Sequence, residues 1–182
     1  GAIFRPGIIV GSTADGAIVD FQNVYGFLRL IHLAQSRLAG RESVIRLEGD
    51  PNTLCNFVPV DWTASALWKI VEHEGPNNGT YHLTDATGAR LGDMMEWVNS
   101  FIEPEGLRFE LTDYLNGSAT AIENMARAAL AHYRPYAFRQ PQFDMANTLR
   151  ATSAHLDLPL PHPEYFDVLY HFARARRWEG AR

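Results

Sequence analysis

The chain has 182 residues, of which 46% are hydrophobic, and it carries a formal net charge of −5. This length and apolar content suit one compact domain, or one domain with an appendage, and exclude a disordered chain or a small disulfide-bonded scaffold. The acidic balance argues against a nucleic acid or an anionic membrane as partner, because phosphate groups are bound by concentrated basic side chains. A single cysteine, Cys55, excludes an internal disulfide and favours a cytoplasmic protein.

The first part of the chain predicts alternating strands and helices. The β-branched run at residues 8–10, bounded by glycines, predicts a strand buried on both faces, as in a parallel sheet. A helix is expected from about residue 20 to 38, and strands at 43–47 and 56–60. Asp61 then has the position of a helix N-cap. The apolar face expected for that helix consists of Ala64, Leu67, Trp68 and Val71.

The rest of the sequence predicts a change from alternating strands and helices to helices alone. A short strand is expected at 80–84, a helix around 91–102 and a strand at 107–111. Thr120 and Glu123 then have the spacing of a capping box. The predicted fold class is α/β to α+β, with a few strands and about six helices. We expect residues 1–112 to hold the strands and residues 113–182 to form a C-terminal helical region.

Several catalytic classes have no signal in the sequence. There is no Gly-x-Ser-x-Gly motif, and Ser12 is expected to lie in a loop. Cys55 has no catalytic signature around it and is expected to be inert. The seven histidines form none of the paired spacings typical of a zinc site, so no metal site is predicted.

Three segments resemble the extended short-chain dehydrogenases/reductases. Residues 4–11 (FRPGIIVG) resemble the Arg-Pro-Gly segment that follows the catalytic helix of that family. Residues 56–61 (NFVPVD) are similar to its later Phe-Val-Pro-Val-Asp element, and residues 79–84 (GTYHLT) to the strand after it. The match covers roughly residues 3 to 102 and is nearest to the fatty-acyl-CoA reductase and thioester reductase branch. Residues 143–148 (FDMANT) also resemble that branch.

Two departures from the family are as informative as the match. The glycine-rich turn that holds the dinucleotide pyrophosphate is absent from the sequence. The family's Tyr-x-x-x-Lys pair is absent too, because the only lysine is Lys69 and the residue four before it is Ser65. The resemblance therefore implies the C-terminal part of an extended Rossmann-like enzyme, without the N-terminal dinucleotide-binding strands and without catalytic residues of its own.

The resemblance also implies a site and a function. It assigns nicotinamide contacts to Pro6, Gly7 and Ile8. It assigns substrate contacts to Ser12, Thr13, Asn56 and Phe57. The implied function is the substrate-binding portion of an NAD(P)H-dependent reductase that acts on an acyl thioester or a related carbonyl. NADP(H) would belong to the intact enzyme, and this chain alone is expected not to bind it tightly.

Other interpretations remain open at this point. The chain also fits half of a nucleotide-sugar epimerase or dehydratase, a non-catalytic binding or carrier-protein docking module, or an ordinary α+β domain that resembles the family by chance. Because isolated parallel strands leave edges unpaired, we expect a partner, either the missing dinucleotide-binding half or a second copy. An acyl-CoA or carrier-protein thioester is a possible further partner.

Overall fold

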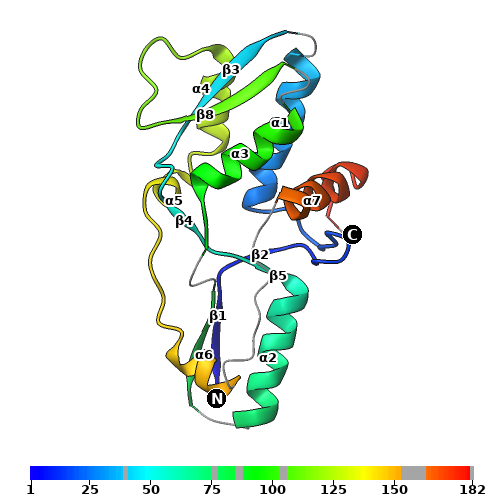
Figure 1. Cartoon of the computed structure of the whole chain (residues 1–182), viewed down its shortest axis with the longest axis vertical. Helices are drawn as coiled ribbons and strands as arrows, with labels where there is room; N and C mark the ends of the chain where they lie inside the picture. The colour runs from blue at the N-terminus through cyan, green and yellow to red at the C-terminus, as the bar shows by residue number, and fades with distance from the viewer. Residues whose placement is uncertain (39–40, 75–77, 85–87, 103–105, 153–162, 181–182) are drawn as a thin grey trace.

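The computed structural model describes residues 1–38, 41–74, 78–84, 88–102, 106–152 and 163–180. Figure 1 shows its helices and strands along the chain. The strands are β1 (Ile3–Pro6), β2 (Ile8–Val10), β3 (Ser43–Glu48), β4 (Leu54–Cys55), β5 (Phe57–Pro59), β6 (Thr80–Leu83), β7 (Ala89–Arg90) and β8 (Leu107–Thr112). The helices are α1 (Val24–Leu38), α2 (Val60–Glu74), α3 (Leu91–Ile102), α4 (Ala121–Ala129), α5 (Arg134–Phe138), α6 (Ala146–Ala151) and α7 (Pro163–Ala175). None of these described helices is long and apolar enough to cross a membrane.

The described strands pair two by two, and three of the four pairs are parallel. β1 pairs with β6, β2 with β5 and β3 with β8 in parallel, whereas β4 and β7 are antiparallel. Parallel neighbours need a crossover connection, and here α1 and α2 lie in the connections between paired strands. The mixed α/β fold predicted from the sequence is confirmed.

Helix side chains close both outer edges of the β3–β8 pair. In α3, the buried Asn99 amide donates to the carbonyl of Phe109 and accepts from its N–H, both at 2.9 Å. In α4, the Glu123 carboxylate accepts from the N–H of Arg46 at 3.0 Å. Both strand residues face away from the partner strand, so each helix side chain occupies the place of a further strand.

The outer edge of β6 is closed in the same way by α6. Asn147 Nδ2 donates to the carbonyl of Thr80 at 3.0 Å, and Thr148 Oγ1 donates to the carbonyl of His82 at 2.7 Å. These two carbonyls point away from β1, because the alternate residues of β6 pair with β1. The short helix α6 therefore ends the sheet on this side.

Two buried clusters hold the described chain together. The larger one joins α1, α3 and α7 to the β3–β8 pair, and the buried apolar face of each of these helices lies in it. The smaller one packs α2 against β6 and α6. The larger cluster draws residues from both sides of residue 112, and the domain boundary expected there stays a prediction.

Two predictions about burial are wrong. The strand β2 is not buried on both faces, because the Ile9 side chain is exposed. The face expected to be buried on α2 is exposed, with Trp68 at 66%, while the opposite face packs inward through Trp62, Ala66 and Ile70. Hydrophobic spacing alone does not choose between two apolar faces of one helix, and α2 carries both.

The N-cap position predicted for Asp61 is also wrong. This residue lies inside the first turn of α2 instead of before it. Its Oδ2 accepts from the N–H and the hydroxyl of Thr13, at 3.1 and 2.6 Å. Asp61 therefore fixes the loop after β2 to the start of α2, and its Oδ1 also accepts from the N–H of Trp62 in the same turn at 3.1 Å, as the sequence predicts.

Candidate functional site

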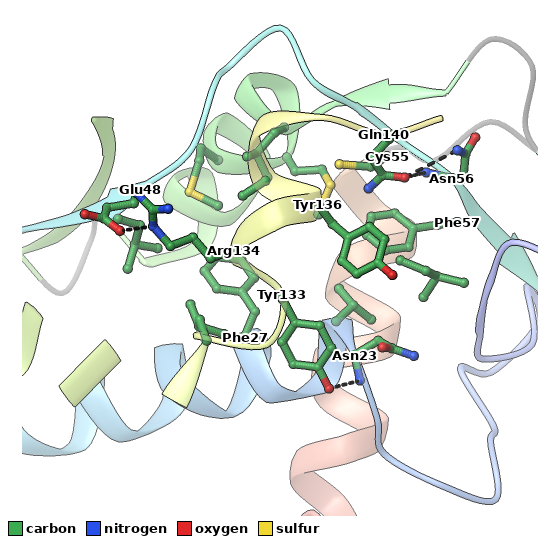
Figure 2. Close-up of a pocket in the computed structure, with 18 of the residues that line it drawn as sticks. Asn23, Phe27, Glu48, Cys55, Asn56, Phe57, Tyr133, Arg134, Tyr136 and Gln140 are labelled. Atoms are coloured by element: carbon green, nitrogen blue, oxygen red, sulfur yellow. Dashed lines mark hydrogen bonds and ion pairs between the residues drawn. The ribbon is translucent and has the colours of Figure 1, made fainter. Parts of the chain in front are cut away.

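A largely apolar cavity of about 410 Å³ lies where the β1–β2 junction, α1, α3 and the carboxyl ends of β3 and β8 meet. Figure 2 shows the side chains that surround it. The carboxyl ends of parallel strands are the usual ligand-binding edge of open α/β sheets. The apolar lining includes Ile8, Phe27, Leu47, Phe57, Met94, Met95, Leu111 and Leu115.

One wall is the backbone between β1 and β2, where two neighbouring strands approach very closely. Gly7 N–H donates to the carbonyl of Leu83, and Ile8 N–H donates to the carbonyl of Asn56 at 2.8 Å. A Cβ on Gly7 would lie 2.7 Å from that Asn56 oxygen, which is closer than carbon and oxygen atoms approach without a shift of the backbone. Glycine is therefore required here to bring the two segments together.

Asn56 and Phe57 form the adjoining wall. The Asn56 side chain is 8% exposed, and its Nδ2 donates to the Gln140 side chain at 3.3 Å and to the Pro141 carbonyl at 3.4 Å. Phe57 is buried and packs edge-on against Phe166 of α7. Polar and apolar groups thus meet at this part of the cavity, as they do in sites that orient a mostly apolar ligand.

The segment 130–143, which contains α5 and is called the strap below, covers the cavity from the other side. Its Ala137 carbonyl accepts from the N–H of Asp50 at 2.9 Å. Its Tyr133 hydroxyl accepts from the N–H of Asn23 at 3.3 Å, as Figure 2 shows. The strap therefore closes the cavity through hydrogen bonds at several points, whereas its own side chains are mostly exposed.

A buried carboxylate holds the strap at the polar end of the cavity. The Glu48 side chain is 5% exposed, pairs with Arg134 Nε at 2.5 Å and accepts from Leu115 N–H at 3.0 Å. Burial raises the pKa of Glu48, but the hydrogen bonds from Arg134 and Leu115 outweigh it, so that the pKa is lowered. Glu48 is therefore charged at neutral pH, and its charge is compensated within the protein.

The remaining buried titratable groups near the cavity are poor nucleophiles or proton donors. Burial raises the pKa of the Cys55 thiol to about 12 and that of the Tyr25 hydroxyl to about 12. Tyr25 accepts from Gly11 N–H at 2.9 Å, and Tyr165 donates to the Gly11 carbonyl. These two tyrosines hold the end of β2 and are not directed at a reacting group.

The structure brings together five of the seven site residues expected from the sequence. Pro6, Gly7, Ile8, Asn56 and Phe57 all line the cavity.

The other two expected residues, Ser12 and Thr13, lie in the loop after β2 and do not line the cavity. Ser12 Oγ accepts from Ala14 N–H at 3.1 Å within that loop, and Thr13 is bonded to Asp61. Their assignment to the substrate stays a prediction.

Sequence reasoning missed the strap and the Glu48–Arg134 pair. Residues 134–142 of the strap carry neither helical periodicity nor a motif, and the two partners of the ion pair are 86 residues apart in the chain. Met94 and Met95, on the helix predicted around 91–102, also line the cavity. No local signal separates a core position from a cavity position on the same helix face.

No family model matches the chain, and no curated protein does. Among solved structures, the terminal R domain from the myxalamid PKS-NRPS biosynthetic pathway is similar, with 18% identity and a TM-score of 0.68, over 99% of this chain and 45% of that chain. A UDP-glucose 4-epimerase is 13% identical with a TM-score of 0.57, over 100% of this chain and 50% of that chain. RMD from Pseudomonas aeruginosa, solved in complex with NADPH, is 12% identical with a TM-score of 0.54, over 96% of this chain and 48% of that chain. The chain spans about half the length of these structures.

Proposed function

We propose that this chain, whose fold is that of the C-terminal half of an extended short-chain dehydrogenase/reductase, forms the substrate-binding portion of an NAD(P)H-dependent reductase. Its substrate is an acyl thioester or a related carbonyl with an apolar chain. The cavity carries the proposal, because it is largely apolar and meets the Pro6–Gly7 backbone at one wall. A cytoplasmic location, expected from the single cysteine, is part of the proposal.

The residues present fit only one edge of a nicotinamide dinucleotide. Pro6, Gly7 and Ile8 offer a backbone wall against which the nicotinamide ring would lie, and the bound ring would supply the hydride. The sequence offers no glycine-rich turn for the pyrophosphate and no tyrosine–lysine pair. The proposal therefore assigns the phosphates and the proton donor to a part of the enzyme outside this chain.

A nucleotide sugar as substrate has less support. Its diphosphate would be held by arginines with free guanidinium N–H groups, and both arginines that line the cavity already donate to other groups of the chain. Arg134 is paired with Glu48, while Arg127 donates to the Leu115 carbonyl at 3.3 Å and to Asn124 Oδ1 at 2.6 Å. The apolar lining favours an acyl chain over a sugar ring.

The test is a calorimetric titration of the isolated chain with octanoyl-pantetheine, UDP-glucose and NADPH. We expect saturable binding of the acyl thioester only. The variant Ala137→Phe, which places a ring in the cavity from the strap, should weaken this binding at least about tenfold. The matched variant Ala128→Phe on the exposed side of α4 should leave it unchanged. Binding of UDP-glucose without the acyl thioester, or equal effects of the two variants, would contradict the proposal.

A further inference from the structure

Two tyrosines of the strap, Tyr133 and Tyr136, line the cavity and differ in what their hydroxyl groups do. The Tyr133 hydroxyl accepts from the N–H of Asn23 at 3.3 Å and so ties the strap to the residue before α1. The Tyr136 hydroxyl has no hydrogen-bond partner within the described part of the chain. Its side chain is 53% exposed, so a ligand in the cavity can reach it. An uncommitted hydroxyl in a largely apolar site is the kind of group that orients a ligand.

The Tyr136 side chain points to one end of the cavity. Figure 2 shows it directed from the strap toward the side of Phe57 and away from Glu48. Phe57 is the register partner of Ile8 in the β2–β5 pair, so this is the end with the backbone wall of the β1–β2 junction. The proposed function places the nicotinamide ring at that wall. A carbonyl that accepts a hydride has to lie beside the ring, and therefore at the end of the cavity to which Tyr136 points.

The hydrogen-bond donors described above at this wall are already used within the fold. Gly7 N–H and Ile8 N–H both donate to backbone carbonyls of neighbouring segments. The Asn56 side-chain amide donates to the strap. A ligand carbonyl at this wall gains no donor from these three groups, and a carbonyl oxygen without a donor costs binding free energy because it has given up its bonds to water. The Tyr136 hydroxyl can supply the missing hydrogen bond.

We propose that Tyr136 is a substrate-binding residue, whose hydroxyl donates a hydrogen bond to the carbonyl oxygen of the acyl thioester and so holds the carbonyl group at the backbone wall. Tyr136 transfers no proton, because the proton donor is assigned above to a part of the enzyme outside this chain. The inference rests on the proposed function for the thioester and adds the side chain of this chain that orients its reacting group. The two tyrosines then divide the work of the strap, since Tyr133 fastens it over the cavity and Tyr136 orients the ligand.

The experiment compares two ligands that differ only at the carbonyl, namely octanoyl-pantetheine and S-octyl-pantetheine, which has a CH2 group in its place. Calorimetric titrations are made with the wild-type chain, with Tyr136→Phe and with the matched variant Tyr133→Phe. We expect the wild type to bind the thioester about fivefold more tightly than the thioether, as one neutral hydrogen bond allows. Tyr136→Phe should lose this preference and bind the thioether as the wild type does. Tyr133→Phe removes a tether of the strap, so it should weaken the binding of both ligands and keep the preference.

An infrared spectrum of the bound ligand tests the same contact without relying on affinities. Octanoyl-pantetheine labelled with ¹³C at the carbonyl should show its C=O stretch at a lower frequency on the wild type than on Tyr136→Phe, and Tyr133→Phe should match the wild type.

The outcomes separate this inference from the proposed function. A thioester preference that persists in Tyr136→Phe, an equal loss for both ligands in that variant, or equal C=O frequencies on the variant and the wild type would overturn the role of Tyr136 and leave the proposed function standing. If the wild type does not bind octanoyl-pantetheine, the proposed function is refuted, and the role of Tyr136 is refuted with it.

Discussion

Glu123 of α4 and Arg46 of β3 form an ion pair in which every acceptor site of the carboxylate is used. Arg46 Nε and its second guanidinium nitrogen donate to the two carboxylate oxygens at 2.7 and 3.0 Å. The same carboxylate accepts from the backbone of Arg46 and, in the capping box predicted from the sequence, from Thr120 N–H. One side chain that is 1% exposed therefore starts a helix, closes a strand edge and joins the two elements.

Replacing Glu123 by Gln should lower the free energy of unfolding by about 1–3 kcal/mol, because its NH2 group would face the guanidinium donors of Arg46. Urea denaturation followed by circular dichroism measures the loss. Glu110→Gln is the control, since Glu110 pairs with Arg108 at 3.6 Å with both side chains half exposed. That change should stay within about 0.5 kcal/mol. Equal losses for the two variants would refute the role given to Glu123.

The contribution of Glu123 to the free energy of unfolding should decrease as the pH is lowered. The hydrogen bond from Arg46 is the main cause that lowers the pKa of Glu123 from 4.5 to about 2. Since the folded state has the lower pKa, this stabilisation is complete above pH 4.5 and is lost as the pH falls toward 2. The difference in urea midpoint between the wild type and Glu123→Gln should therefore shrink between pH 5.5 and pH 3. A constant difference over this range would contradict the assignment.

Gly7→Ala should destabilise the chain by about 1–3 kcal/mol and disturb the cavity wall. The added methyl group would lie 2.7 Å from the Asn56 carbonyl oxygen, which is backbone and cannot rotate away. Gly26→Ala in α1 is the matched control, because a Cβ there meets nothing within 4 Å. Alanine in a helix interior should stabilise by up to about 1 kcal/mol. Thermal unfolding should show a lower melting temperature for Gly7→Ala and an unchanged or higher one for Gly26→Ala. A higher melting temperature for both variants would contradict the close approach of Gly7 to the Asn56 carbonyl.

Cys55 should not react with a thiol reagent in the folded chain. It is 3% exposed, and burial raises its pKa to about 12, so almost no thiolate is present at pH 8. Absorbance after addition of a disulfide reagent should show one thiol in guanidinium chloride and a rate at least about a hundredfold lower without it. Rapid native labelling would show that this wall of the cavity opens.

Arg134→Met should loosen the strap while the rest of the fold persists. The change leaves the buried Glu48 carboxylate without its ion-pair partner and should cost about 1–3 kcal/mol, because Glu48 keeps its bond from Leu115. Hydrogen exchange should rise in residues 130–143 and much less in α1 or α3. The control is Arg150→Met, since Arg150 is exposed and, among the described residues, bonds to its helix neighbour Asn147. Similar exchange in both variants would show that the ion pair does not hold the strap.

The parts of the fold that sequence reasoning predicts correctly are those with a local cause. The helices expected at about 20–38 and around 91–102 and the capping box at Thr120 depend on residues within a few positions of one another. The face of α2 was predicted wrongly because its two apolar sides differ only in what packs against them. Trp62 and Trp68 illustrate this, since one is 7% and the other 66% exposed on the same helix.

The site was predictable only where a short segment forms it. The Arg-Pro-Gly and Asn-Phe segments provide five of the cavity residues, because each is a continuous turn or strand end. The Glu48–Arg134 pair and the strap depend on contacts between distant segments, for which a single sequence carries no signal. Ser12 and Thr13 follow a strand that does lead to the cavity, but the loop turns toward α2 and is held there by Asp61.

The closure of β6 by Asn147 and Thr148 limits how copies of this chain can aggregate. Growth of a cross-β fibre needs two open edges on every unit, one to receive the next copy and one to be offered to it. Asn99 and Glu123 close the β3–β8 pair on both sides, so that, as far as the described residues go, the β1 edge is the one left open in these two sheets. Edge-to-edge association through these two sheets therefore stops at two copies, because the four polar helix side chains prevent a further strand from pairing at the closed edges.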